Sequence, residues 1–348
     1  MTADVIQLPD APRIPGLRFR HFRAGRDFGH MANILRASAE VDGTERADTP
    51  EELETLFAHL TNCDPYTDMI FAEVDPGDGR EPEVIGYSRG TWRMEANGEY
   101  RYMFFVRVPP AWRRKGIGQA ILRWVEGRLR EIAAGHPPEV EKYFLSLAEQ
   151  GETDLAALLE NTGYQPERYG FEMVRPDLEN IPDTPLPEGL EVRPVLPEHY
   201  RAIWEADTEA FRDHWGFVEP SEEDYQAWLV DTTVFQPELW QVAWDIATNQ
   251  VAGQVRTYID HEQNQLYHRQ RGWTEFISVR RPFRRRGLAR ALIARSLQAQ
   301  KQAGMTESAL GVDSENLSGA TKVYEDCGFR VVKRNTIYKK SLGTIGQT

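Results

Sequence analysis

The feature that most constrains the fold of this chain is a basic, glycine-containing segment that occurs twice. It reads VRVPPAWRRKGIGQAILRWVEGRL at residues 106–129 and VRRPFRRRGLARALIARSL at residues 279–297. In both copies a strand-like stretch precedes the arginines, and an apolar pattern of helical period follows the glycine. The two copies lie at similar distances from Gly16 and Gly189, which each precede another strand-like stretch. Two domains of similar architecture are therefore expected.

The boundary between these domains is expected in RPDLENIPDTPLPEGL, residues 175–190, whose proline content is typical of an interdomain linker. The prediction is an N-terminal domain over residues 1–178, a linker over 179–188 and a C-terminal domain over 189–348. A chain of 348 residues is long enough for two domains of ordinary size.

Both halves show the same order of predicted elements. The expected helices lie within 28–60, 200–215 and 222–232, and the expected strands at 69–74, 83–93, 99–108, 239–245, 250–259 and 273–279. After the basic segment each half has a helix, a strand at 142–148 or 307–313, a second helix and a closing strand. Helices interspersed with strands indicate an α/β layer fold in each half.

Composition and charge narrow the possible functions. The net charge of −13 argues against general nucleic-acid binding, which needs a basic face. No apolar run reaches the ~20 residues that cross a bilayer, and no secretory signal is seen, so a cytoplasmic protein without membrane or nucleic-acid partners is expected. Two cysteines, Cys63 and Cys327, fit a reducing compartment, with Cys327 expected as a packed thiol. The histidines lack metal-binding spacing, so no metal site is predicted.

The basic segment is a candidate anion site. Its pattern is Arg-x-x-Gly-x-Gly/Ala, with Gly287 and Ala289 in the second copy. The first turn of a helix leaves backbone N–H groups without internal partners and carries about half a positive charge. Small residues there let a phosphate approach the backbone, and arginine side chains can add charge. An exposed basic helix start is the alternative interpretation.

The residues after the second copy are Val312, Asn316, Tyr324 and Gly328-Phe329. This order of strand, basic glycine loop, helix, strand, Asn, helix, Tyr and Gly-Phe resembles the GNAT superfamily of acetyl-CoA-dependent acyltransferases. The resemblance covers about residues 190–340 and, more weakly, the first half, and the tandem arrangement resembles mycothiol synthase and its relatives. It implies two α/β, GNAT-like domains, each with a mixed, mostly antiparallel sheet flanked by helices and a splayed pair of parallel strands.

The resemblance implies acetyl-CoA as cofactor. Its pyrophosphate would lie on the arginine-flanked loop, and its acyl arm would lie between the splayed strands, near Leu310 and Val312. The implied cofactor-binding residues of the C-terminal domain are Ile277, Val279, Arg284, Arg285, Arg286, Gly287, Leu288, Ala289 and Asn316. Their N-terminal counterparts are Val108, Arg113, Gly116 and Gly118. Asn316 could instead serve only as a helix cap.

The implied reaction is direct attack of an acceptor amine on the acetyl thioester in a ternary complex. Tyr324 stands where the family has its proton donor to the departing thiolate, with core packing as the alternative role. The backbone N–H of Val279 matches the donor to the carbonyl oxygen.

Glu275 is the candidate base, because Glu275, Ile277 and Val279 should alternate onto one face of a strand. Some family members carry this glutamate two residues earlier, where this chain has Trp273. An exposed strand carboxylate is the alternative for Glu275. His214 is a second candidate base, with a packed aromatic turn as its alternative role.

The N-terminal domain departs from the pattern. The two halves align from Tyr164 and Phe329 with a constant offset, which places Gly151 and Leu159 where the C-terminal domain has Asn316 and Tyr324. The N-terminal domain is therefore expected to bind a coenzyme A-like molecule without acetyl transfer, or to shape the acceptor cleft of its neighbour.

A small-molecule amine is the expected acceptor. Between residues 205 and 231 one basic residue, Arg212, stands against nine acidic ones, which would attract a cation: Glu205, Asp207, Glu209, Asp213, Glu219, Glu222, Glu223, Asp224 and Asp231. An ordinary solvated helix face is the alternative. For the whole protein the alternative function is a non-catalytic acyl-CoA-binding or sensing module. A monomer is expected rather than a homodimer, since two related domains can pack together within one chain.

Overall fold

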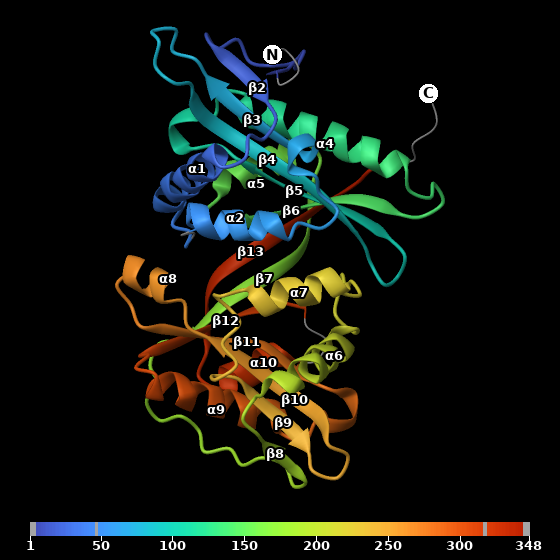
Figure 1. Ribbon diagram of the computed structural model, residues 1–348, viewed down its shortest axis with the longest axis vertical. Helices are drawn as coiled ribbons and strands as arrows, with labels where there is room; N and C mark the ends of the chain where they lie inside the picture. The colour runs from blue at the N-terminus through green and yellow to red at the C-terminus, as the bar shows by residue number, and fades with distance from the viewer. Residues whose placement is uncertain (1–4, 46–47, 316–318, 344–348) are drawn as a thin grey trace. The chain divides into compact units, whose positions relative to one another are not determined.

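The computed structural model describes residues 5–45, 48–315 and 319–343, which form two compact units. The N-terminal unit comprises Met1–Arg168 and Asn335–Thr348, and the C-terminal unit comprises Tyr169–Arg334. Both have the expected α/β architecture, in which helices flank a mixed, mostly antiparallel sheet (Figure 1). No helix in these ranges is long and apolar enough to cross a bilayer.

The N-terminal unit has the strand order β1-β2-β3-β4-β5-β6-β13, and only the β5–β6 pair is parallel. Its strands are β1 (Val5–Ile6), β2 (Leu17–Arg20), β3 (Met69–Val74), β4 (Glu83–Met94), β5 (Tyr100–Arg107), β6 (Lys142–Glu149) and part of β13 (Arg330–Ser341). Its helices are α1 (Arg26–Asp42), α2 (Pro50–Ala58), α3 (Pro65–Asp68), α4 (Ile117–Ala134) and α5 (Thr153–Asn161). A 3-10 turn, η1 (Pro110–Trp112), precedes α4.

The C-terminal unit repeats this plan in the order β7-β12-β11-β10-β9-β8, and only β11–β12 is parallel. Its strands are β7 (Gln165–Arg175), β8 (Leu190–Val192), β9 (Gln241–Asp245), β10 (Gln250–Tyr258), β11 (Arg271–Val279) and β12 (Glu307–Asp313). Its helices are α6 (Tyr200–Phe211), α7 (Glu222–Val230), α8 (His261–Leu266), α9 (Leu288–Gln302) and α10 (Ala320–Asp326). The 3-10 turns are η2 (Pro197–His199) and η3 (Arg281–Phe283).

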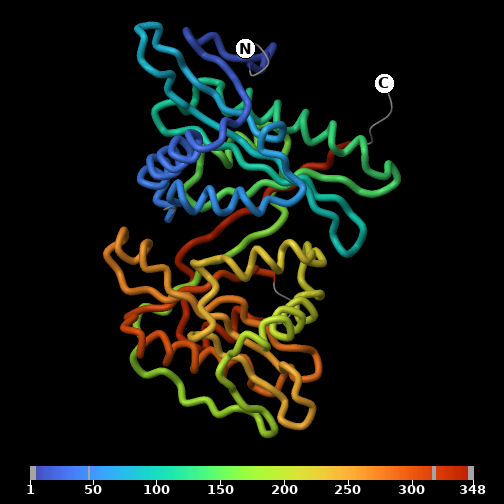
Figure 2. The backbone as a smooth tube through the Cα atoms, in the orientation of Figure 1, coloured from blue at the N-terminus to red at the C-terminus, as the bar shows by residue number. Residues whose placement is uncertain are grey.

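Each sheet is closed by a strand that belongs, in chain order, to the other half. Residues 335–341 of β13 pair antiparallel with β6, and residues 170–175 of β7 pair antiparallel with β12. Figure 2 shows the red end of the chain among the green and cyan strands of the N-terminal unit. The compact units therefore differ from a division at residues 178 and 189, because Tyr338 is buried in the N-terminal core and Met173 in the C-terminal core.

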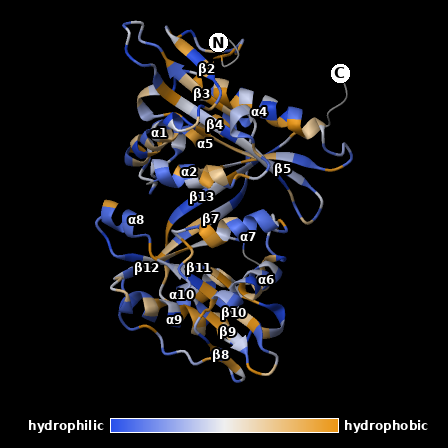
Figure 3. Cartoon of the chain, viewed as in Figure 1, coloured by the Kyte–Doolittle hydropathy of each residue, from blue (hydrophilic) through white to orange (hydrophobic). Residues whose placement is uncertain are grey.

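Each sheet has an apolar core on both faces. In the N-terminal unit, α4 and α5 cover the larger core, and α1 and α2 cover a second core rich in phenylalanine. In the C-terminal unit, α9 and α10 cover one face, and α6 and α7 cover an aromatic cluster on the other. Figure 3 shows that α4 and α9 carry both hydrophobic and hydrophilic residues, as expected for helices with one face on a sheet.

The helices differ in whether a side chain caps their first turn, and α4 and α9 share an uncapped start with α1, α5, α6 and α10. Thr49 and Ser221 begin α2 and α7 with capping boxes, in which their hydroxyls accept from the third helical N–H. The helices α4 and α9 have no side-chain cap and begin at Gly116 and Gly287. Their first N–H groups are thus left without a side-chain acceptor.

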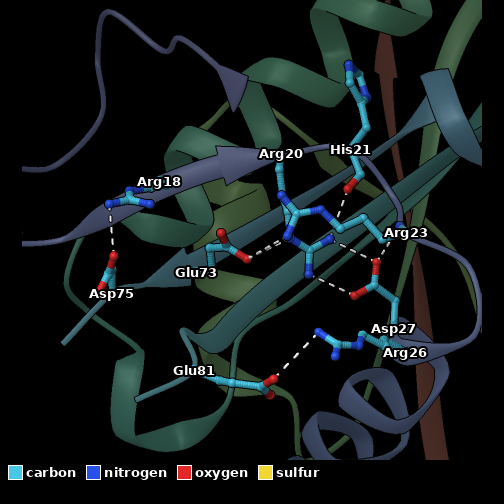
Figure 4. Close-up of polar contacts among 9 residues, drawn as sticks. All are labelled: Arg18, Arg20, His21, Arg23, Arg26, Asp27, Glu73, Asp75 and Glu81. Atoms are coloured by element: carbon cyan, nitrogen blue, oxygen red, sulfur yellow. Dashed lines mark hydrogen bonds and ion pairs between the residues drawn. The ribbon is translucent and has the colours of Figure 1, made fainter. Parts of the chain in front are cut away.

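A buried charge cluster joins β2 of the N-terminal unit to its neighbours (Figure 4). Arg20, only 3% exposed, donates two hydrogen bonds to Asp27 at the start of α1 and one to Glu73 on β3. Both carboxylates are also buried. The cluster therefore fixes β2, α1 and β3 to one another with fully desolvated partners.

Candidate active site

The parallel strands β11 and β12 diverge as the family resemblance implies. Their ladder covers Arg271–Trp273 against Glu307–Ala309, although β11 runs on to Val279 and β12 to Asp313. Beyond the ladder, Glu275 extends into the opening, where its Oε1 accepts a hydrogen bond of 2.6 Å from the Gly311 backbone N–H. A side chain thus takes the place of the strand-to-strand bond where the ladder ends.

The expected alternation of Glu275, Ile277 and Val279 is wrong, because β11 is bulged at this point. Phe276 has a left-handed φ of 49°, and the register with β10 shifts by one residue between the pairs Gln254–Ser278 and Arg256–Glu275. Directly opposed residues share a face, so Glu275 lies on the face of Arg256. Ile277 and Val279 instead pack against the core under α9.

The environment of Glu275 suits a base at neutral pH. Burial raises the pKa of this half-buried carboxyl from 4.5 to about 7, although the N–H groups of Gly311 and Phe276 favour its charged form. A carboxyl with a pKa near the working pH is well matched to proton transfer.

Tyr324 is a buried residue of α10. It is 7% exposed and belongs to the core under α9 together with Leu310 and Leu288. Burial raises the pKa of its hydroxyl, and the neighbouring Glu275 charge raises it further. The hydroxyl is therefore protonated at neutral pH and able to donate a proton.

The glycine loop follows β11 directly. Arg285 and Gly287 both have left-handed φ values, 60° and 86°, which turn the backbone into the uncapped start of α9. Leu288 is buried in the core and anchors that first turn, whereas Ala289 is half-buried. Gly287 is exposed, and a Cβ there would meet nothing within 4 Å. The start of α9 thus presents its backbone N–H groups to the surface, which is the arrangement that binds phosphate.

Most of the loop arginines are committed to the protein itself. The Arg284 guanidinium donates to the Val279 carbonyl at 2.9 Å, to Asp213 at 3.0 Å and to the Ala210 carbonyl at 3.0 Å. Arg281 also pairs with Asp213, and the two arginines hold the pKa of Asp213 well below its usual range.

Arg286 donates to the Glu188 carbonyl at 2.7 Å. By contrast, in the described ranges no hydrogen bond or ion pair involves the Arg285 side chain, which is exposed. Of the three consecutive arginines, Arg285 is thus the one available to an anion. Asn316 lies outside the described residues.

Several acidic residues of the stretch 205–231 pair with arginines, some buried and some exposed. Asp207 pairs with the buried Arg256 at 2.6 Å, and Glu209 pairs with Arg280 at 2.7 Å. Further pairs join Glu219 to Arg212 and Glu222 to Arg201. The excess of acidic side chains counted from the sequence is therefore much reduced at the surface of α6 and α7.

The sequence also selected His214 as a second candidate base and Cys327 as a packed thiol. His214 is exposed just beyond α6, where its ring lies 4.4 Å from that of Phe211, and partial desolvation lowers its pKa. Cys327 is buried at the end of α10, and burial raises its pKa, so it is a packed thiol. Neither residue has the position of Glu275 between the diverging strands.

The N-terminal unit also has a short parallel ladder, but not the same side chains beyond it. Its ladder between β5 and β6 ends at Met103 and Leu145, and the Ser146 hydroxyl then donates to the Phe104 carbonyl at 3.1 Å. At the position of Tyr324 it has Leu159, which is fully buried. A Cβ on Gly151 would lie 1.5 Å from the Asp42 carbonyl oxygen, so the Gly151 backbone packs against the Asp42 backbone and leaves no room for a side chain.

Sequence reasoning missed the carboxylates that hold the loop arginines. Asp42 binds both Nη atoms of Arg113 at 2.6 and 2.7 Å, as Asp213 binds Arg284 in the other unit. The partners are 71 residues apart in both units. This equal spacing of an aspartate before each basic segment was the available signal.

Two units with a splayed parallel pair, a basic glycine loop and an uncapped helix define a tandem acyltransferase architecture. The sequence model described as the acetyltransferase (GNAT) family matches residues 32–146 and again residues 200–329. The chain therefore belongs to the GNAT acetyltransferase family and contains two copies of its domain.

Curated relatives agree with this assignment. A mycothiol acetyltransferase of Salinispora arenicola is 29% identical over 193 residues, which span 54% of this chain and 54% of that protein. A mycothiol acetyltransferase of Paenarthrobacter aurescens is 24% identical over 304 residues, 86% of this chain and 88% of that protein. The S. arenicola alignment thus spans about half the length of that relative.

Solved structures share the fold over nearly the whole chain. A GCN5-related N-acetyltransferase from Sphaerobacter thermophilus has a TM-score of 0.70 at 24% identity and covers 97% of both chains. A tandem GNAT protein from the clavulanic acid biosynthesis pathway has a TM-score of 0.64 at 16% identity, over 94% of this chain and 99% of that one. The tandem arrangement is therefore shared with a solved protein.

Proposed function

We propose that the C-terminal unit transfers the acetyl group of acetyl-CoA to an amine of a small molecule. The observation that supports this most is the position of Glu275 between β11 and β12 beyond their ladder, where its charge also acts on the buried Tyr324 hydroxyl. One carboxyl there has a pKa of about 7, and the neighbouring phenol is protonated. These are the two proton-transfer groups that acetyl transfer to an amine requires.

The C-terminal unit offers a suitable setting for acetyl-CoA. The N–H groups at the start of α9 and the Arg285 side chain suit a pyrophosphate. The partly buried Ile277, Val279 and Val312 supply apolar walls for a flexible arm. Acetyl-CoA, when bound, supplies the activated acetyl thioester.

The chain's own residues account for the proton movements. An alkylamine with a pKa near ~10.4 is mostly protonated at neutral pH, so a base must first remove a proton. Glu275 takes that proton, the amine nitrogen forms a bond to the carbonyl carbon, and the carbon–sulfur bond breaks. Tyr324 gives its hydroxyl proton to the departing sulfur and recovers a proton from the second one that the nitrogen loses as the amide forms. The first proton, held on Glu275, is later released to solvent. The products are an amide and the free thiol, formed within a ternary complex.

The proposed acceptor is a small-molecule amine, because Glu275 can act as a base toward an amine and the curated relatives are named for a small acceptor. The acidic residues of α6 and α7 are largely paired, so they lend little support to a cationic acceptor. The curated relatives are called mycothiol acetyltransferases, which favours a low-molecular-weight acceptor. Cytoplasmic location and a monomeric state are proposed with this function.

The proposal is tested by initial rates of thiol release from acetyl-CoA with a panel of small amines, including acceptors related to mycothiol. When the concentrations of acetyl-CoA and of the amine are both varied, double-reciprocal plots of the rates should give intersecting lines, as expected for a ternary complex. Parallel lines would indicate a covalent acetyl-enzyme and contradict direct attack. Binding of acetyl-CoA without thiol release with any acceptor would favour the non-catalytic alternative.

A further inference from the structure

The glycine loops of the two units are almost identical in backbone geometry. Arg113 and Arg284 have φ, ψ values of −67°, 160° and −66°, 159°, and Arg114 and Arg285 both have a φ of 60°. Gly116 and Gly287 follow with φ values of 83° and 86°. The N-terminal loop therefore has the backbone of an anion site, although its unit lacks the proposed catalytic side chains.

The loops differ in what faces their second arginine. Arg114 donates from Nε to Asp154 Oδ1 at 2.5 Å, and Asp154 Oδ2 lies 3.8 Å from Nη1 of Arg113. The offset between Tyr164 and Phe329 places Gly319 at the position of Asp154 in the C-terminal unit. Gly319 carries no carboxylate, and Arg285 has no partner among the described residues. Asp154 of α5 thus pairs with the loop arginine of the N-terminal unit, whereas the equivalent Arg285 has no such partner among the residues that the structure describes.

A pocket of about 280 Å³ adjoins this contact. Its lining includes Gly116 and Asp154, together with apolar side chains of β5 and α5 such as Val106 and Leu158. Ser38 of α1 also lines it, and this side chain is 8% exposed with a hydroxyl that has no hydrogen-bond partner in the described part of the chain. A buried hydroxyl without a partner beside an open pocket is costly unless a ligand or water satisfies it.

The arginines around the pocket already form ion pairs with carboxylates of the protein. Arg113 is paired with Asp42, and Arg107 is paired with the buried Glu152 at 2.6 Å. Asp154 completes the compensation by pairing with Arg114. An incoming pyrophosphate would have to displace a carboxylate from Arg114 and lie next to that carboxylate's charge, which is unfavourable.

We infer that the N-terminal pocket is a second site for a coenzyme A-type pyrophosphate, which Asp154 keeps closed by acting as an internal anion on the loop. This inference rests on the proposed function, since the ligand class is taken from the matching loop of the C-terminal unit. Removing the Asp154 charge leaves Arg114 and the α4 N–H groups free for phosphate, with Ser38 available to the ligand's polar atoms. The wild-type chain then binds one coenzyme A, and a chain without this charge binds two.

The test is calorimetric titration of coenzyme A into the full-length wild type, Asp154→Asn and Asp154→Gly. Asp154→Gly introduces the residue found at the equivalent position of the other unit. Both variants should bind two molecules per chain, with the second site at least about 10-fold tighter than in the wild type. The matched control is Asp10→Asn, which removes an exposed aspartate paired with Arg123 of α4, away from the loop, and should leave one site. Thermal unfolding checks that each variant is folded.

Repeating the titration in a Gly287→Glu background separates this inference from the proposed function. The Gly287→Glu protein that keeps Asp154 should bind no coenzyme A. The double variant Gly287→Glu, Asp154→Asn should bind one molecule. Two sites in the wild type, or no additional site in either Asp154 variant, would overturn the inference. If Gly287→Glu left wild-type binding unchanged, the proposed C-terminal site would be wrong, while a gain of binding in Asp154→Asn would still support the closed N-terminal site.

Discussion

At the scale of single residues, Glu275 lies between two strands at the point where their hydrogen bonding ends, and its pKa is raised to about 7 by burial. A base acts when deprotonated, so kcat/KM should rise with pH through about 7 and level off above it. Glu275→Gln should lower the rate and remove this rise. A pH–rate profile of both proteins measures the effect, and an unchanged profile in Glu275→Gln would show that another group titrates.

The raised pKa of Glu275 should also make the stability of the fold depend on pH. Folding raises the pKa of Glu275 above its unfolded value of 4.5, so ionisation in the folded state costs stability as pH rises from 4.5 through about 7. Glu275→Gln should therefore gain stability relative to the wild type when thermal unfolding is compared at about pH 5 and about pH 8. A difference that stays constant across this range would contradict the raised pKa.

Tyr324→Phe tests the proposed proton donor. The substitution keeps the ring in the core, so acetyl-CoA binding and stability should change little, whereas turnover should fall roughly 10²-fold or more. Tyr338→Phe, which removes a hydroxyl bonded to Glu160 in the N-terminal unit, is the control and should keep wild-type turnover. Equal turnover in the two variants would assign Tyr324 to packing alone.

The residue scale also shows where sequence reasoning stops. The motif selected Tyr324, which lies on the helix α10 as expected, and its role as proton donor stays a prediction. Glu275 was selected from a strand alternation that the structure does not show, and its role as base also stays a prediction. The bulge at Phe276 was not predictable, because it depends on the register with β10 rather than on any turn-forming residue in β11. The partners of Arg284 were missed because they lie 71 and 74 residues earlier in the chain, beyond the reach of local patterns.

At the scale of elements, the cluster around Arg20 should determine how firmly β2, α1 and β3 are held together (Figure 4). Arg20→Met would leave the buried Asp27 without its guanidinium partner and Glu73 with only Arg23 at 3.8 Å, which should cost about 3–5 kcal/mol. The matched control is Arg18→Met on the same strand, whose pair with Asp75 is more exposed and should contribute about 1 kcal/mol or less. Denaturant unfolding measures both, and equal losses would show that burial of the Arg20 pairs is unimportant.

Most strands and long helices were predictable from periodicity, including β3, β10 and α9. The short α8 was not predicted, since six residues give no clear helical period. The partners of the closing strands β7 and β13 could not be read from the sequence either. Their pairing depends on long-range register and on the burial of Met173 and Tyr338, which local patterns do not contain.

At the scale of the whole molecule, the closing strands make the two units depend on distant parts of the chain. A chain ending at Arg334 would lose the seven residues that pair with β6, and with them the buried Tyr338. Amide exchange should then become fast in residues 142–149, while residues 307–313 of the C-terminal unit keep their protection. A chain ending at Gly343 retains all of β13 and is the control. Unchanged protection of 142–149 in the shorter chain would show that β13 is dispensable for the N-terminal unit.

The central claim is that the C-terminal glycine loop binds acetyl-CoA for catalysis. The most direct measurement is acetyl-CoA binding and thiol release in Gly287→Glu, with Gly304→Glu as the control. Both glycines have a φ of 86° and open space around a Cβ, so the two substitutions impose the same backbone strain at opposite ends of α9. Loss of binding and turnover in Gly287→Glu, with both retained in Gly304→Glu, is the predicted result. Wild-type binding and turnover in a folded Gly287→Glu protein would contradict the account.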